Sequence, residues 1–394
     1  MKGRTKVHTA RSVKEAALER TAYIFSSYDK VSVSFSGGKD STACLHLALD
    51  EAKRRDRLPL RVIFFDEEVI TPPTVEYVER VRHWPGVALE WYCIPVQHRN
   101  ACSNVQPWWR CWDPAIPKLW VRERPADCIT EHPAFKLGMT LPEFGLAVVA
   151  RNECCIQGIR TQESMRRYRA LTAKINDNFI ARKHGKAFAY PIYDWMSSDV
   201  WRLVREEGYD YNRTYDIYQR TRLYNELLGQ RICAPFGEEP LRGAWKYAEC
   251  FPELHHKMLY RVPGAATAWR YGNSELYNSA KGKPEGMTWE EYAELQLSNY
   301  PKATQAAARY AVRFAVDQHK KKTGDPIPEE KPHVLSGCSW KFIATIAIKG
   351  DFKGRTGQSM ADKAVSERNR RGLSYRDALN QHATEKFKAT ATPR

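Results

Sequence analysis

The chain has 394 residues, 43% of them apolar and 12% aromatic, which is enough to bury more than one domain core and excludes a disordered chain. The formal net charge of +16 predicts an anionic substrate or partner. The N-terminus lacks the apolar segment of a signal peptide, and no apolar run reaches the roughly 18 residues of a transmembrane helix. Ten cysteines are an ordinary number, so the sequence predicts a reduced, cytoplasmic protein without membrane contact.

Helical and strand patterns alternate in the first hundred residues. The helices show apolar residues at helical spacing, and the strands are alternating or near-continuous apolar runs. In chain order we expect a helix at 12–27, a strand at 31–35, a helix at 41–55, a strand at 60–65, a helix at 74–84 and a strand at 88–96. This order predicts an α/β fold with a doubly wound, mostly parallel sheet.

The middle of the chain interrupts this order and then resumes it. Residues 97–145 are rich in proline and tryptophan, which predicts an irregular insertion. Beyond the insertion we expect strands at 154–160 and 187–193, a helix from about residue 163 between them, and a capped helix opening at Ser198.

The last part of the chain has no strand pattern. It is helical and aromatic-rich from about residue 212, and residues 320–333 resemble an exposed linker. Residues 331–394 carry 13 Lys or Arg against 5 Asp or Glu, which is typical of a solvated basic tail or of a region that contacts DNA or RNA. The expected segments are an N-terminal helix at 1–27, an α/β domain at 28–210 with the insertion at 97–145, a mainly helical domain at 211–322 and a basic region at 323–394.

The strongest local signal is a glycine-rich loop between the strand at 31–35 and the next helix. Two adjacent glycines allow positive φ, and successive backbone N–H groups can then form an anion-binding nest at the helix N-terminus. A lysine adds charge, and hydroxyl groups add donors. The residues are Ser36, Gly37, Gly38, Lys39, Asp40, Ser41 and Thr42. The glycine spacing differs from that of a Walker A loop, and the pattern predicts a phosphate-binding site.

Four stretches in the first 201 residues resemble a known superfamily and one family within it. Residues 34–41 resemble the signature of the PP-loop ATP pyrophosphatases, which bind adenine nucleotides on an α/β fold. The other three resemble motifs of the phosphoadenosine phosphosulfate (PAPS) reductase family. They are Phe64-Phe65-Asp66-Glu67-Glu68, Gly158-Ile159-Arg160-Thr161-Gln162-Glu163-Ser164, and residues 190–195 followed by Asp199-Val200-Trp201.

This resemblance implies the members of an adenine-nucleotide site. It places Phe64, Phe65 and Asp66 near the adenine and ribose, and Arg160 opposite phosphate or sulfate. ATP is the expected nucleotide, with PAPS or adenylyl sulfate as alternatives, and Mg²⁺ would bridge the phosphates. The expected binding residues beyond the loop are Phe64, Phe65, Asp66, Gly158, Ile159, Arg160 and Ser164; the expected catalytic residues are Lys39, Asp40 and Arg160; the expected metal contacts are Asp40 and Asp66.

The residue types leave other roles open at three of these positions. Arg160 could form a salt bridge with a neighbouring acid instead of binding phosphate. Asp40 could cap the helix N-terminus instead of positioning a metal ion. The pair Asp194-Trp195 in the fourth motif could serve to fix the turn from strand to helix.

The second half of the chain resembles a different domain. Residues 230–239, 261–265 and 339–341 are similar to a C-terminal domain of unknown function in immunoglobulin-binding regulator A type proteins of bacteria and phages. This resemblance implies a ParB-like protein as a partner.

The cysteines depart from the reductase pattern. A PAPS reductase uses a cysteine nucleophile in a C-terminal Glu-Cys-Gly-x-His motif, which is absent; the last cysteine is Cys338. Cys154-Cys155 form a pair, but no Cys-x-x-Cys occurs, and the cysteines of the insertion fit no compact zinc pattern. We therefore expect neither thiol-dependent reduction nor an iron–sulfur cluster or zinc.

Three functions fit these observations. The first is an ATP-dependent adenylyltransferase, or a related sulfonucleotide enzyme of sulfur metabolism, acting at the α-phosphate. The second is an enzyme that modifies nucleic acid, which the basic C-terminus and a set of tryptophans able to stack on bases would support. Those tryptophans are Trp108, Trp109, Trp112 and Trp120. The third is a nucleotide-sensing regulator without turnover.

Overall fold

A six-stranded sheet lies in the N-terminal half of the protein, as seen in a computed structural model. The structure describes residues 10–103, 105–163, 167–168, 171, 179–220, 232, 236, 245–271, 283–351 and 354–390. The strand order is β3-β2-β1-β6-β8-β7, and all neighbours are parallel except the β7–β8 pair. The strands are β1 (Lys30–Phe35), β2 (Leu60–Phe65), β3 (Val87–Tyr92), β6 (Glu153–Gln157), β7 (Ile180–Lys183) and β8 (Lys186–Ala189). The predicted doubly wound, mostly parallel sheet is confirmed.

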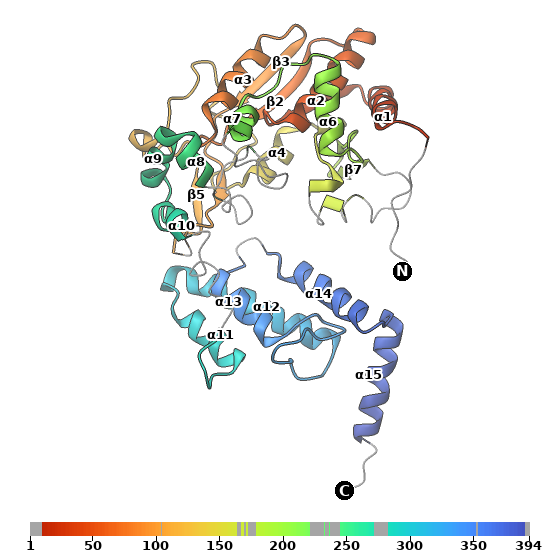
Figure 1. Ribbon diagram of the computed structural model, residues 1–394, viewed down its shortest axis with the longest axis vertical. Coiled ribbons are helices and arrows are strands. Elements are labelled where there is room, and N and C mark those ends of the chain that lie inside the picture. Colours follow the sequence, from red (N-terminus) through yellow and green to blue (C-terminus); the bar gives the residue numbers. More distant parts are fainter. Residues whose placement is uncertain are drawn as a thin grey trace. The chain divides into compact units, whose positions relative to one another are not determined.

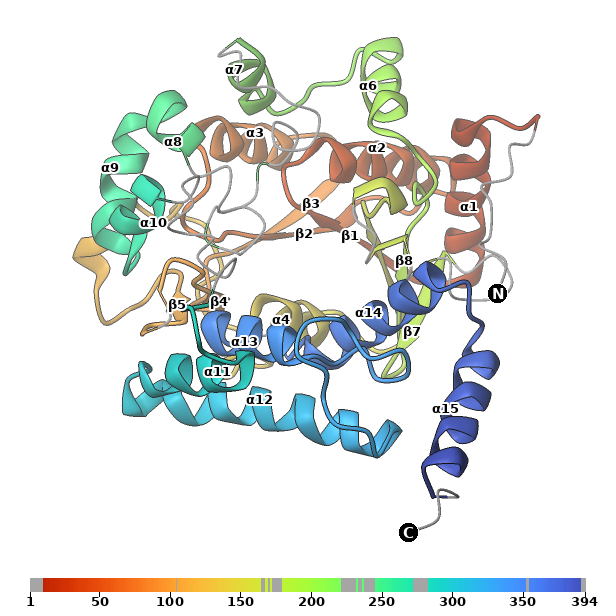
Figure 2. The same cartoon turned by 60° about the horizontal axis from the view of Figure 1, so that its bottom comes forward.

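Helices cover both faces of this sheet (Figures 1 and 2). Figure 2 shows α1 (Val13–Ser27), α2 (Lys39–Arg54) and α3 (Pro72–Arg82) along one face and α4 (Leu141–Val148) along the other. The strands are buried accordingly: Val33 and Val62 have no exposed surface. Such double coverage explains why β2 is a near-continuous apolar run rather than an alternating one.

Several predicted boundaries differ from those observed. The strand predicted at 154–160 ends at Gln157, and the strand predicted at 187–193 is β8, which ends at Ala189. β8 forms a hairpin with β7, a strand that was not predicted. The insertion is not wholly irregular, because β4 (Gln97–Arg99) pairs with β5 (Trp108–Arg110) and α4 starts at Leu141. The helix predicted from about residue 163 lies mostly outside the described residues.

The capped helix predicted at Ser198 is α6 (Ser197–Glu206). Asp199 supplies the cap, since its carboxylate accepts the Met196 N–H at 2.7 Å. The remaining helices of this region are short: α7 (Thr214–Arg220), α8 (Trp245–Cys250), α9 (Pro252–Arg261) and α10 (Ala265–Tyr271). Among the described residues no helix has both the length and the apolar character needed to cross a membrane.

The chain divides into two compact units. One comprises Lys6–His98 and Trp108–Ala266, and so holds the whole six-stranded sheet together with α7 to α9. The other comprises Arg99–Pro107 and Thr267–Arg394 with residues at the N-terminus. Its helices are α11 (Trp289–Ser298), α12 (Lys302–Lys322), α13 (Trp340–Lys349), α14 (Thr356–Arg370) and α15 (Tyr375–Thr390). The predicted mainly helical C-terminal region is confirmed.

The helical unit has its own apolar core. Trp289 and Leu297 of α11 pack with Ile343 and Ala347 of α13, and Ala308 of α12 belongs to the same cluster. The lysines predicted to open a linker at residue 320 instead end α12, which runs to Lys322. The segment that follows is held by Asp325, whose carboxylate contacts His333 at 3.0 Å and His382 of α15 at 2.9 Å.

A buried ion pair joins α9 to the end of β2 inside the sheet-containing unit. Glu68 has no exposed surface, and its two carboxylate oxygens accept from Arg261 Nε at 2.7 Å and from a terminal guanidinium nitrogen at 2.8 Å. The same carboxylate accepts the Trp112 N–H at 2.6 Å and the Val121 N–H at 3.3 Å. Glu68 therefore connects β2, the insertion and α9.

We predict that Arg261→Met destabilises the protein by about 3–5 kcal/mol, because the Glu68 carboxylate would stay buried without its counter-charge. Urea unfolding at neutral pH measures the change. Arg202→Met is the matched control: Arg202 forms an exposed pair with Glu206 within α6, and its loss should cost less than about 1 kcal/mol.

The double variant Glu68→Gln/Arg261→Met should recover part of the lost stability, since glutamine is neutral and still accepts a backbone N–H. Equal unfolding midpoints for Arg261→Met and the wild type would contradict this role for the pair.

Candidate functional site

The glycine-rich loop connects β1 to α2 as predicted, and its own side chains hold its shape. Phe35 ends β1, Gly37 takes a φ of 71°, and α2 starts at Lys39. The Ser36 N–H donates to Ser41 Oγ at 3.1 Å, and Ser41 Oγ donates to the Gly38 carbonyl at 2.9 Å. The loop thus leads directly into a helix N-terminus, the position that favours an anion. The Gly38 N–H donates to Ser36 Oγ at 3.4 Å, so a bound anion would replace contacts within the loop.

The sheet topology explains which second motif meets this loop. β1 lies between β2 and β6, and the chain leaves toward β2 and β3 before it returns to β6 on the other side. The β1–β6 junction is therefore the switch point, outside whose carboxyl ends ligands bind in doubly wound sheets. The loop after β1 and residues 158–160 after β6 meet there. The sequence indicated both motifs separately, but the strand order brings them together.

Gly158 permits the close approach of these two segments. A Cβ atom at this position would lie 2.6 Å from the carbonyl carbon of Asp40, 2.7 Å from its oxygen and 2.7 Å from the Ser41 nitrogen. Real Cβ contacts do not reach such distances, and backbone atoms cannot rotate away. A glycine is thus required for the segment after β6 to lie on the first turn of α2.

Three charged side chains meet at this point. Arg160 Nε donates to Asp40 Oδ1 at 2.7 Å, and Lys39 Nζ lies 3.2 Å from Asp40 Oδ2. Lys39 and Arg160 are only 2% and 3% exposed. Burial lowers the pKa of Lys39, which the negative charge of Asp40 opposes. The trio carries a net charge of +1, and the alternative role predicted for Arg160, a salt bridge with a nearby acid, is present.

Asp40 does not cap the helix. The cap residue is Gly38, which makes no side-chain cap bond, and Asp40 stands two residues further on with its carboxylate turned toward Arg160. Of the two roles considered for Asp40, capping is therefore wrong.

Residues that follow α6 form hydrogen bonds with the backbone of the loop. The Lys39 N–H donates to the Tyr215 hydroxyl at 3.1 Å, and Asn212 Nδ2 donates to the Gly37 carbonyl at 3.0 Å and to Thr74 Oγ1 at 2.8 Å. A Cβ atom on Gly38 would lie 3.8 Å from Ile232 Cδ1. The Tyr215 hydroxyl occupies the N–H that an anion at the tip of α2 would use.

The predicted adenosine contacts are engaged within the protein. Phe64 is buried and packs at 5.2 Å against Trp91, while Phe65 packs at 5.5 Å against Phe144 of α4. Both oxygens of Asp66 have partners: Oδ2 accepts from Trp91 Nε1 at 2.8 Å, and Oδ1 accepts the Glu68 N–H at 2.9 Å and pairs with Arg122. Asp66 is 2% exposed.

The carboxylates expected to help hold Mg²⁺ do not fit that role. Mg²⁺ in nucleotide sites uses one or two free carboxylates together with phosphate oxygens and water. Asp40 is engaged by two cations and Asp66 by four donor groups, one of them the Cys93 thiol at 3.7 Å from Oδ2. The described residues contain no group of three or more His, Cys, Asp or Glu arranged for a metal ion.

The other predicted site residues lie as follows. Ile159 continues the turn after β6, and its N–H donates to the Gln157 carbonyl at 2.9 Å. Ser164 lies outside the described residues. Asp194 pairs with Arg20 of α1 at 2.8 Å, and Trp195 Nε1 donates to the Val13 carbonyl at 3.0 Å. Asp194 and Trp195 of the fourth motif therefore hold α1 in position through an ion pair and a hydrogen bond.

The cysteines that resemble reductase features are buried and uncharged. Cys154 and Cys155 lie inside β6, and Cys338 belongs to the core of the helical unit. Burial raises the pKa of each of these three thiols to about 12. A thiolate nucleophile is disfavoured at all three positions.

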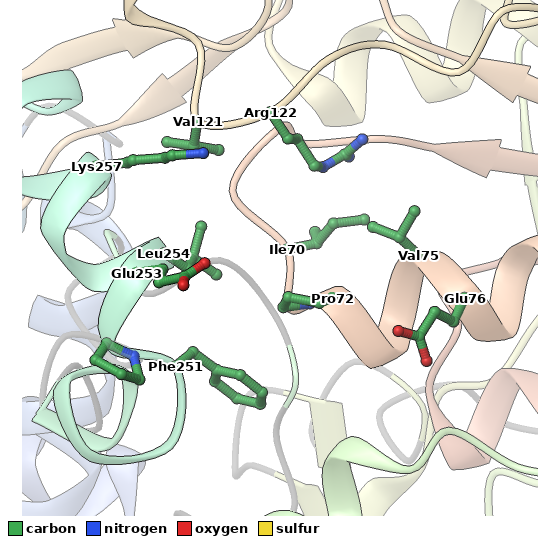
Figure 3. Close-up of a pocket in the computed structure, with 11 residues that line it drawn as sticks. Ile70, Pro72, Val75, Glu76, Val121, Arg122, Phe251, Glu253, Leu254 and Lys257 are labelled. Carbon is green, nitrogen blue, oxygen red and sulfur yellow. The ribbon is translucent and has the colours of Figure 1, made fainter.

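A cavity of about 580 Å³ opens beside α3, on a different face of that helix from the loop. Figure 3 shows Ile70, Pro72 and Val75 on one wall and Leu254 on the opposite one. Thr74 of the same helix contacts the loop instead, since a Cβ atom on Gly37 would lie 3.0 Å from Thr74 Cγ2. None of the described residues that line this cavity belongs to the glycine-rich loop.

Sequence reasoning missed several residues around the loop. Three of them, Asn212, Tyr215 and Ile232, lie beside the loop, and Arg261 pairs with Glu68 after β2. Each is 140 or more residues away along the chain from the segment that it contacts. The only sequence signal was that Ile232 and Arg261 fall in the stretches that resemble the C-terminal domain of unknown function. Nothing in those stretches indicated which elements they would contact.

Comparisons with known proteins divide the chain into two matches. Residues 30–221 match the phosphoadenosine phosphosulfate reductase domain, and residues 225–365 match a domain of unknown function, DUF3440. The uncharacterized protein YbdN of Escherichia coli K12 is 30% identical over 373 residues, which cover 88% of this chain and 90% of YbdN.

Solved structures show weaker similarity. A phosphoadenylyl-sulfate reductase from Candida auris is 13% identical and matches with a TM-score of 0.31, covering 54% of this chain and 94% of the reductase. The FMN adenylyltransferase of Candida glabrata is 14% identical at a TM-score of 0.32, covering 53% and 62%. Scores this low carry no functional argument.

We predict that Gly158→Ala destabilises the protein by about 1–3 kcal/mol, because its Cβ atom would push the segment after β6 away from α2. Gly145→Ala is the control: its Cβ atom would meet Phe65 at an ordinary 3.6 Å inside a helix, so stability should stay equal or rise by up to about 1 kcal/mol. Urea unfolding compares the two, and an unchanged midpoint for Gly158→Ala would refute the constraint.

Proposed function

This chain belongs to the phosphoadenosine phosphosulfate reductase domain family, and we propose that it binds ATP at Ser36–Thr42 and transfers the adenylyl group to an acceptor. The observation that carries the proposal is the convergence of the glycine-rich loop, Asp40 and Arg160 at the switch point of the sheet. A sulfonucleotide in the same site is the alternative substrate.

In the proposed reaction an acceptor oxygen attacks the α-phosphorus of ATP. A new phosphorus–oxygen bond forms on the acceptor, the bond from the α-phosphorus to the bridging oxygen breaks, and pyrophosphate leaves with that electron pair. The acceptor proton passes to solvent or to a nearby base. Lys39 and the N–H groups at the tip of α2 would stabilise the charge that develops on the pyrophosphate.

Arg160 and Asp40 have distinct roles in this proposal. The Asp40 carboxylate accepts from Arg160 Nε at 2.7 Å, and a terminal guanidinium nitrogen donates to Gln162 Oε1 at 2.9 Å. A phosphate or sulfate group would therefore exchange with Gln162 for the guanidinium, while Asp40 keeps it in place. Tyr215 must release the Lys39 N–H when the anion binds, because one N–H cannot serve both. No protein cysteine takes part, which agrees with three buried thiols whose pKa burial raises.

We predict that Lys39→Ala weakens ATP binding by about 10- to 100-fold, the effect of losing a charged hydrogen bond. Titration calorimetry measures the affinity, and Lys53→Ala, an exposed lysine in the last turn of the same helix, is the control with unchanged affinity. Equal ATP affinity for Lys39→Ala and the wild type would refute the loop assignment.

Pyrophosphate release from ATP, measured with and without added DNA or RNA, tests the reaction. Release by the wild type and its loss in Lys39→Ala support adenylyl transfer, and release that requires nucleic acid would identify the acceptor class. ATP binding without pyrophosphate release under either condition would contradict the enzymatic proposal and leave a nucleotide-sensing role.

A further inference from the structure

Among the residues that the structure describes, Lys246 is a buried cation without a counter-charge. Its side chain belongs to α8 and is 2% exposed, the same fraction as Lys39. Its Nζ atom has no hydrogen-bond partner within the described part of the chain. The other buried lysines and arginines of the described residues do have one: Lys39 and Arg160 contact Asp40, Arg261 contacts Glu68, and Arg99 donates to the Pro107 carbonyl.

An unpaired ammonium inside a protein is unfavourable, because burial removes its hydration and nothing replaces it. The face of Tyr218, whose ring centroid lies 5.2 Å from Nζ, offers partial compensation, and Cys250 of the same helix opposes the effect of burial on the lysine pKa. Burial accordingly lowers the pKa of Lys246 to about 8. A bound anion would supply the missing charge.

Two tyrosines connect Lys246 to the glycine-rich loop. Tyr215 and Tyr218 stand three positions apart on α7 and so project from the same side of that helix, about one turn apart. The Tyr215 hydroxyl accepts the Lys39 N–H, and Lys39 Nζ lies 5.7 Å from the Tyr215 ring. Lys39 and Lys246 thus lie against successive rings of one aromatic strip, and both belong to the sheet-containing unit.

The net positive charge beside the loop is smaller than the negative charge of an ATP polyphosphate. Asp40 neutralises one of the two positive charges of Lys39 and Arg160. The polyphosphate of ATP carries several negative charges, which exceed the +1 that remains. Lys246 lies against Tyr218, about one helical turn along α7 from the ring that Lys39 contacts, and would supply a second cation for part of this excess.

We propose that Lys246 binds a terminal phosphate or sulfate oxyanion of the ligand held by the glycine-rich loop. The proposal rests on the proposed function, because it takes that ligand to occupy Ser36–Thr42. It assigns a binding role to a residue of the DUF3440 match, which thereby contributes to the site formed by the reductase domain match.

Calorimetric titration of the full chain with ATP, AMP and inorganic pyrophosphate tests the proposal. Lys246→Met should weaken ATP and pyrophosphate binding by about 10- to 100-fold and leave AMP affinity within about threefold, since AMP lacks the outer phosphates. Lys246→Arg should recover part of the affinity, and Lys53→Met is the exposed control. Wild-type affinities for ATP and pyrophosphate in Lys246→Met would overturn the proposal.

The melting temperature of Lys246→Met gives a second test, because the substitution should raise it without ligand and lower it, relative to the wild type, with ligand bound. Without ligand, Lys246→Met should melt at a higher temperature than the wild type, because methionine fills similar space without a buried charge. With saturating pyrophosphate the order should reverse. A lysine that served only the fold would instead lower the ligand-free melting temperature when replaced, and that outcome would contradict the proposal.

Proton uptake tests the wild type directly. The free amine has a pKa of about 8. An anion beside it raises that pKa, so binding at pH 8 should take up about half a proton more than at pH 6, where the amine is already charged. Titrations in buffers of different ionisation enthalpy measure the uptake, and Lys246→Met should lack this increment. An identical uptake in both proteins would overturn the proposal.

The two proposals fail in different ways. If Lys39→Ala loses ATP affinity while Lys246→Met keeps it, the loop assignment stands and only the Lys246 role is rejected. If the wild type binds neither ATP nor pyrophosphate, both proposals are rejected together.

Discussion

The contact between the first turn of α2 and the segment after β6 is the constraint on which the candidate site depends. Gly158 lets the two backbones meet, and the ion pair of Asp40 with Arg160 joins them. Without that contact the loop would retain its shape, since its own hydroxyl groups maintain it, but Arg160 would not face it. A site in which Lys39 and Arg160 both face one anion therefore requires the segment after β1 and the segment after β6 together.

The parts that the sequence predicted were those with local causes. The alternating pattern of β1, the apolar run of β2, the helix after the glycines and the order of the four motifs depend on residues close together in the chain. Arg160 was recognised from its motif, yet its partner Asp40 could be identified only once β6 was known to lie beside β1. Lys246, Asn212 and Tyr215 have no such motif, because their roles arise entirely from tertiary contacts.

The acidic stretch after β2 shows how a motif can serve the fold. Asp66 and Glu68 resemble ligand-binding residues, but protein donors occupy their oxygens, several of them from the insertion. Trp112, a candidate for base stacking, is fully buried and donates its indole N–H to the Asp66 carbonyl at 2.8 Å. Buried carboxylates require such complete pairing, so this region of the site is rigid before any ligand arrives.

The Glu68–Arg261 pair also bears on how such a protein can evolve. The reductase domain match ends at residue 221, whereas the arginine that neutralises Glu68 belongs to the DUF3440 match. A chain shortened at that border would keep every strand of the sheet and still contain a buried, unmatched carboxylate. The two family matches consequently share one compact unit, and an exchange of domains at the border between them would also require a substitution of Glu68 or a new counter-charge for it.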